Sequence, residues 1–131
     1  MMNPRAPRAL VAMVAALSLG APAPAFAHAN HGEPMYGGVV AEAGMFQGEL
    51  VVKGNQFTIH ITSHGEPVST AGAQAKVTVL AGTQKVEFTL SPSGENRFAG
   101  TPGVPLASGA RAVVAVRLAD GRAGSLRFEV R

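Results

Sequence analysis

The chain has 131 residues, enough for one domain, and it contains no cysteine, which excludes disulfides, thiolate metal sites and catalytic cysteines. Eleven Lys and Arg residues against eight Asp and Glu residues give a net charge of +3. The basic residues are scattered and have no interleaved aromatic side chains, so we expect no nucleic-acid partner.

The first 27 residues have the three parts of a secretory signal peptide. Arg5 and Arg8 precede an apolar run over residues 9–19, and an A-x-A cleavage site ends at Ala27. An eleven-residue helix is about 16 Å long, shorter than the roughly 30 Å core of a bilayer, so a membrane anchor is the weaker alternative. We therefore expect a periplasmic protein that is cleaved near Ala27 and not embedded in the membrane, with secretion as the lesser possibility.

Residues 28–36 are polar, contain Gly32 and Pro34, and show no periodicity, so we expect a flexible arm. From residue 37 onward, apolar and polar residues alternate with period two between turn signals rich in Gly, Pro and Asn. Strands are expected over 48–53, 56–62, 75–81, 85–90, 110–119 and 124–130. This spacing favours an all-β domain over 37–131, an antiparallel immunoglobulin-like β-sandwich of about seven strands, with a small closed barrel as the alternative.

The alternation also predicts which side chains form the core. One face of each expected strand is apolar, while the opposite face carries residues such as Lys85, Glu87, Arg127 and Glu129. The predicted core residues are Leu50, Val52, Phe57, Ile59, Ile61, Val77, Val79, Val86, Phe88, Leu90, Val114, Val116, Leu118, Leu126, Phe128 and Val130.

One hairpin can be placed in register from the sequence. Gly54 and Asn55 form a favourable two-residue turn between two alternating segments. Counted outward from this turn, the expected pairs are Lys53–Gln56, Val52–Phe57, Leu50–Ile59, Glu49–His60 and Met45–His64. Because cross-strand partners share a face, the last two pairs would lie together on the side away from the core.

Every histidine of the chain lies between residues 28 and 64, together with two methionines. Imidazole suits copper, zinc and nickel, whereas thioether selects Cu(I), so a His/Met set without cysteine favours copper. The candidate metal ligands are His28, His31, Met35, Met45, His60 and His64, with Glu49 as a weak or outer ligand. Cleavage after Ala27 would give His28 a free amine beside its ring, a chelate suited to Cu(II). The alternative is that these side chains are solvated and bind nothing.

Catalytic motifs are missing from the sequence. Ser63, His64 and Glu66 are close in the chain, but a catalytic triad is formed in space rather than by adjacency. There is no G-x-S-x-G elbow, P-loop or dinucleotide-binding fingerprint, so we expect no enzyme activity. The Gly37-Gly38 pair is interpreted as a closely packed start of the first strand, and Tyr36 as an anchor at the edge of the core.

The stretch "YGGVVAEAGMFQGELVV", followed by "FTIHITSHGEPVSTAGAQAKVTVLAG", resembles a family of small exported bacterial proteins encoded beside heavy-metal efflux systems. It is also similar to a periplasmic segment of the adaptor subunits of heavy-metal efflux pumps. The likeness covers about residues 35–130 and places His64 on the family's turn histidine and Glu49 in its strand motif. Met35 and Tyr36 stand where the family has histidine. A weaker likeness, to periplasmic copper carriers with a terminal histidine, involves His28.

These observations lead to one main hypothesis and two alternatives. The main hypothesis is a periplasmic accessory protein that binds or passes on copper in connection with efflux. The alternative is a metal-free interaction module that docks on an envelope or efflux partner through a sheet edge or the 101–109 loop. An inhibitor or chaperone-like binder is a third, weaker possibility.

Overall fold

The computed structural model describes residue 20 and residues 32–130; the other residues of the expected signal peptide and the histidines at 28 and 31 lie outside this part of the chain. Residues 32–130 form strands and no helix, and no segment among them qualifies as a membrane-spanning helix. The strands are β1 (Val39–Glu42), β2 (Gln47–Lys53), β3 (Gln56–Ser63), β4 (Glu66–Pro67), β5 (Gln74–Ala81), β6 (Gln84–Pro92), β7 (Arg97–Gly100), β8 (Arg111–Arg117) and β9 (Ala123–Glu129).

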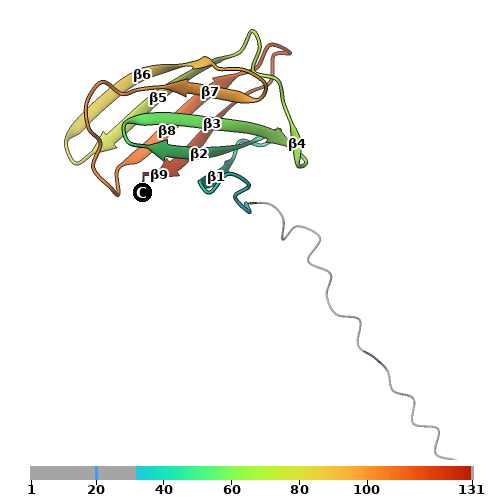
Figure 1. Ribbon diagram of the computed structural model, residues 1–131, viewed down its shortest axis with the longest axis horizontal. Helices are drawn as coiled ribbons and strands as arrows, with labels where there is room; N and C mark the ends of the chain where they lie inside the picture. The colour runs from blue at the N-terminus through green and yellow to red at the C-terminus, as the bar shows by residue number, and fades with distance from the viewer. Residues whose placement is uncertain (1–19, 21–31, 131) are drawn as a thin grey trace, which may run out of the picture.

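All strand pairs are antiparallel and belong to one sheet with the order β1-β2-β3-β7-β6-β5-β8-β9, while β4 pairs with the end of β3. β6 joins the two halves of this sheet, because most of it pairs with β5 and its last residues pair with β7. The edge strands β1 and β9 approach each other with Cα atoms within 8 Å (Figure 1). The sheet therefore curls into a nearly closed structure around one core.

The predicted all-β class is confirmed, although residues 32–130 form nine strands where about seven were expected. Two short strands were not predicted, β4 and β7, and β1 was expected only from the Gly37-Gly38 pair at its start, without bounds. Because the end of β6 continues onto β7, the strands form one curled sheet, which resembles the small closed barrel considered as the alternative. The immunoglobulin-like sandwich remains a prediction.

The predicted register of the β2–β3 hairpin is confirmed from Lys53–Gln56 to Glu49–His60. Gly54 has φ of 59°, as the first central residue of a type II′ turn requires, and this turn matches the twist of the flanking strands. The pairing ends at Gln47–Thr62, so the expected Met45–His64 pair lies just beyond the ladder. The hairpin therefore presents Glu49 and His60 side by side on its outer face.

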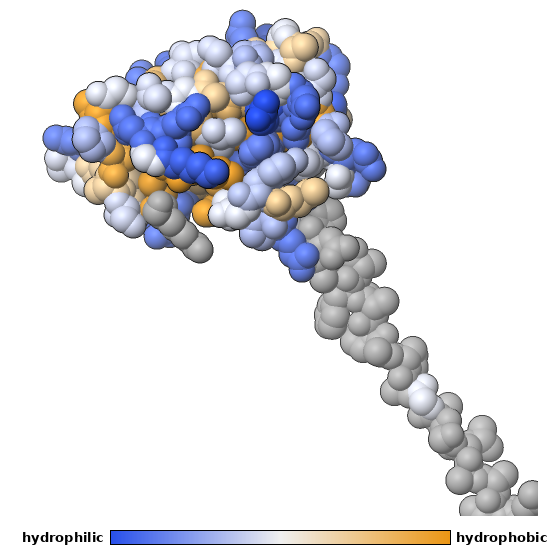
Figure 2. All heavy atoms as spheres, viewed as in Figure 1, coloured by the Kyte–Doolittle hydropathy of each residue, from blue (hydrophilic) through white to orange (hydrophobic). Residues whose placement is uncertain are grey.

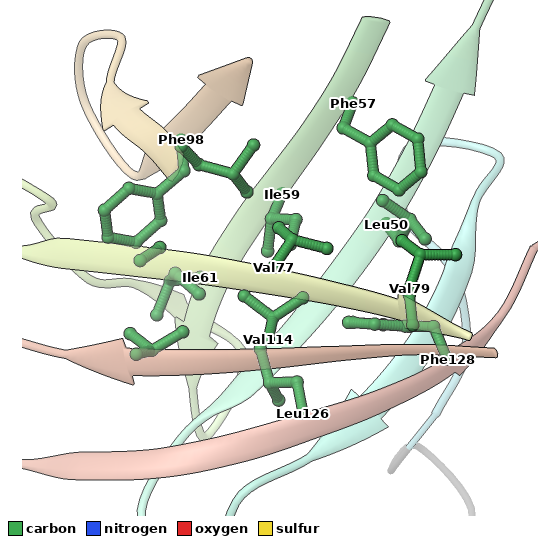
Figure 3. Packing of buried hydrophobic residues seen from close by; sticks show 14 of the residues in the cluster. Leu50, Phe57, Ile59, Ile61, Val77, Val79, Phe98, Val114, Leu126 and Phe128 are labelled. Atoms are coloured by element: carbon green, nitrogen blue, oxygen red, sulfur yellow. The ribbon is translucent and has the colours of Figure 1, made fainter. Parts of the chain in front are cut away.

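The two faces of the sheet differ in polarity as the alternation predicted. The outer surface over β3 and β7 is largely hydrophilic (Figure 2). Inside, Leu50 and Ile59 from the hairpin point toward Val77, Val114 and other apolar residues of β5, β8 and β9 (Figure 3). All sixteen predicted core residues belong to the core or pack against it, with Val52, Val86 and Phe88 only partly buried. Two large buried residues were not predicted: Phe46 and Phe98.

Candidate functional site

A buried carboxylate holds the chain that precedes β1. Glu49 projects from the outer face of β2, yet only 5% of it is exposed, because residues 35–38 fold over it. Its Oε1 accepts a hydrogen bond from the backbone N–H of Met35 at 2.6 Å, and its Oε2 accepts from Tyr36 at 2.7 Å and from Gly38 at 2.9 Å. We call this group of four residues the Glu49 clasp. Three backbone donors already occupy the carboxylate that the sequence suggested as a weak metal ligand.

Glycine is required where the clasp meets the sheet. A Cβ on Gly38 would collide with the carbonyl oxygen of Leu50, so only glycine permits this close approach. Gly37 has φ of 76°, in the region that favours glycine. The predicted closely packed start of the first strand is therefore confirmed, and it turns the preceding residues back over Glu49.

An aromatic stack forms the second half of this contact. The ring of Tyr36 lies on the ring of His60, with centroids 3.7 Å apart and planes 7° from parallel. His60 is flanked by two charged cross-strand partners, Glu49 on β2 and Arg97 on β7. Burial lowers the pKa of His60 below its usual value of 6.5, Arg97 lowers it further, and Glu49 opposes the shift. Among residues 32–130, the buried Nδ1 has no hydrogen-bond partner, and the ring packs against Tyr36.

Met45 and His64 meet at the other end of the same hairpin. Both line a small hollow of about 70 Å³ together with Glu42, Gly44, Phe46, Gln47 and Ser63. The Ser63 hydroxyl donates a hydrogen bond to the Met45 carbonyl at 3.2 Å, which ties the two segments together. Met45 is 65% exposed, and His64 is exposed as well. The predicted neighbourhood of these two residues is thus present, although no strand pairing joins them.

The turn that carries His64 has an unusual backbone. His64 and Gly65 have φ of 51° and 80°, and they connect Ser63 to its β4 partner Glu66. Two positive φ values are the signature of a type I′ hairpin turn, in which asparagine and glycine are the favoured residues. Histidine tolerates this region better than most side chains. The turn fixes the backbone of His64 beside the hollow.

The predicted ligands therefore fall into separate groups. The clasp brings Glu49, His60 and the backbone of Met35 together, whereas Met45 and His64 share the hollow. Among residues 32–130, no group of three or more His, Asp or Glu side chains is arranged to hold a metal ion. Sequence reasoning did not find the stacking role of Tyr36 or the position of Arg97 beside His60.

The 101–109 loop, proposed as an alternative docking element, presents several apolar residues. Val104 is 45% exposed. Val104, Pro105 and Leu106 line a hollow of about 410 Å³ with Val86 of β6 and neighbouring residues. This loop is therefore partly packed on β6 and partly open to solvent.

Comparisons with known proteins give no guide to function: no family model, no curated protein and no solved structure matches this chain.

Proposed function

We propose that the protein is an exported periplasmic accessory protein that binds or passes on copper, with Met45 and His64 as its principal ligands. The observation that carries this proposal is the position of the two residues around one hollow. A thioether selects Cu(I), and imidazole suits copper in either oxidation state. Neither residue lies in the core, so both are available to an ion from solution.

The exposure of Met45 and His64 favours transfer of copper to a partner over its storage. An ion held by two surface side chains keeps an open side, where a partner's ligand can attack. Glu42 also lines the hollow, and its carboxylate accepts a hydrogen bond from Gln47. Met35, His60, and the N-terminal histidines at 28 and 31 are further candidates, which the experiment below separates from the principal pair.

The setting of this activity is part of the proposal. The signal peptide pattern supports export, and the resemblance to proteins encoded beside heavy-metal efflux systems supports a link to efflux. The even spacing of short strands, together with the weaker likeness to periplasmic copper carriers, supports the immunoglobulin-like sandwich as the finer fold. The intact mass of the exported protein, with and without added copper, tests the cleavage site and the stoichiometry together.

The decisive experiment is a Cu(I) titration of the exported protein against a chromophoric chelator at about pH 7. We expect binding tighter than about 10 µM, which corresponds to roughly 7 kcal/mol. Met45→Leu removes the thioether with little change of volume. His64→Asn removes the imidazole but keeps a residue that tolerates the left-handed turn. Each variant should weaken binding about tenfold or more, a loss of about 1.4 kcal/mol.

Met35→Leu is the matched control, because Met35 is 66% exposed and Met45 is 65% exposed. It should change the affinity less than about twofold. If Met35→Leu or His60→Phe weakens binding as much as Met45→Leu, the site lies at the clasp and the assignment to Met45 and His64 is wrong. Failure of the wild-type protein to bind Cu(I), Cu(II) or Zn(II) more tightly than about 10 µM would refute metal handling and leave the interaction module.

A further inference from the structure

The positive charges of the domain gather on one surface. Strand alternation turns five cationic side chains to the outer face of β5, β6, β8 and β9. We call this surface the cationic face, and its members are Lys76, Lys85, Arg111, Arg117 and Arg127. It carries only two carboxylates, Glu87 and Glu129. In the rest of residues 32–130, acidic side chains outnumber basic ones, so the charge is strongly asymmetric.

A groove of about 840 Å³ crosses one end of the cationic face. Its lining includes residues from all four strands, among them Lys76, Arg117 and Ser125. The inward-pointing members of the lining, such as Leu90 and Val116, are almost completely buried, so the open space lies on the outer side of the sheet. Small outward side chains at 115, 123 and 125 form its floor and leave room for a ligand to approach the backbone closely.

The two cationic side chains that line the groove, Lys76 and Arg117, differ in their ion pairs. Glu87 lies 3.2 Å from Lys85 and 3.5 Å from Lys76, and all three side chains are exposed. No carboxylate lies within ion-pair distance of Arg117 among residues 32–130. Its planar guanidinium can bind a carboxylate through two parallel hydrogen bonds. Arg117 is therefore available as an anchor for an anionic partner, and Lys76 can exchange Glu87 for a second anion.

The spacing of these cations matches an extended peptide. Lys76 pairs with Ala115 across β5 and β8, and Arg117 is two residues further along β8. The Cα atoms of such diagonal neighbours lie about 7–8 Å apart. In an extended chain, alternate residues share a face, and their Cα atoms are about 6.6 Å apart. We propose that this groove binds an extended acidic segment of a partner protein, with carboxylates on alternate residues that meet Arg117 and Lys76.

The shape of the groove favours a peptide over a lipid surface. A flat anionic bilayer does not enter a recess that crosses four strands, and none of the large exposed apolar side chains of residues 32–130 lines the groove. Two separate exposed cations also suit two linked carboxylates better than one small anion. This inference uses no residue of the proposed copper site, so either proposal can fail without the other.

The test uses the exported protein and a blocked heptapeptide of alternating serine and glutamate. Backbone amide chemical shifts at Lys76, Ala115, Arg117 and Ser125 should move together and saturate during the titration, and the affinity should fall as salt rises. Lys76→Gln combined with Arg117→Gln should weaken binding about fivefold or more, since it removes two exposed ion pairs.

The matched control combines Lys53→Gln with Arg122→Gln, which removes the same charge from positions outside the cationic face. It should change the affinity less than about twofold. Equal losses in the two double variants would mean that only net charge matters and would overturn the proposal. So would shifts located elsewhere, equally tight binding of a peptide with three adjacent glutamates, or binding to anionic phospholipid vesicles without binding to the peptide.

Discussion

Replacing Glu49 tests whether the clasp stabilises the domain. Glu49→Ala removes the acceptor of three backbone hydrogen bonds, from Met35, Tyr36 and Gly38. Hydrogen bonds to a charged group contribute about 1.5–3 kcal/mol each when the partners are buried. Residues 35–37 are exposed, so water can replace part of this interaction, and the substitution also removes a buried charge. We therefore expect a loss of about 2–4 kcal/mol in the free energy of unfolding.

Glu49→Gln gives a finer test of the same geometry. An amide can keep its oxygen at the position that accepts from Tyr36 and Gly38, but its NH₂ group then faces the N–H of Met35. One donor is left without an acceptor, so we expect a loss of about 1–2 kcal/mol. For a domain of this size the total stability is about 5–15 kcal/mol, so both losses are measurable by urea denaturation.

Two further measurements decide the interpretation. Amide hydrogen exchange at Met35, Tyr36 and Gly38 should be slow in the wild-type protein and fast in Glu49→Ala. Glu66→Gln is the control, since Glu66 is exposed on β4, and it should change stability by less than about 0.5 kcal/mol. The reasoning fails if both Glu49 variants unfold at the wild-type urea concentration with unchanged exchange at the three amides.

Two other predictions concern the stack and the core. Because burial lowers the pKa of His60 below 6.5, the unfolded chain takes up a proton first as the pH falls, so stability decreases from about pH 6.5 downward until His60 also protonates in the folded state. His60→Phe keeps an aromatic partner for Tyr36, so urea denaturation between about pH 5 and 8 should show a smaller decrease; an unchanged slope would assign the effect to other groups. Phe98→Ala should cost about 3–5 kcal/mol, because Phe98 is fully buried. The control Phe88→Ala, at a partly exposed position, should cost less, and an equal or larger loss there would contradict the assigned packing.

The sequence was most informative where local chemistry and alternation agree. Gly54 and Asn55 allow only a short turn, and the apolar residues on either side permit one register that buries Leu50 and Ile59 together. The pairing of Glu49 with His60 followed from that register. The strands β4 and β7, which were missed, and β1, whose bounds were not predicted, have two to four residues, too few to establish a period. Phe98 was missed because its strand lies between the turn-rich segments 91–96 and 101–109.

The candidate site was predictable only in part, for a physical reason. Side-chain periodicity shows which face of a strand a residue occupies, and this placed Glu49 and His60 on the outer face of the hairpin. The clasp is formed by backbone N–H groups of an irregular segment, and every residue except proline has such a group. The sequence therefore does not indicate that the Glu49 carboxylate accepts hydrogen bonds from backbone N–H groups. The place of Met35 in the clasp likewise depends on the conformation of residues 35–38.

The clasp also has a consequence for how this cysteine-free chain resists unfolding. Its hydrogen bond between Glu49 and Met35 closes a loop between positions 14 residues apart. A disulfide that closed a loop of similar length would stabilise a domain by about 3 kcal/mol, within the range expected for the clasp. A carboxylate bound to amides contains no sulfur, so neither thiol reductants nor thiol oxidants can open it. The attachment of residues 35–38 to the sheet is thus independent of the redox potential of its surroundings.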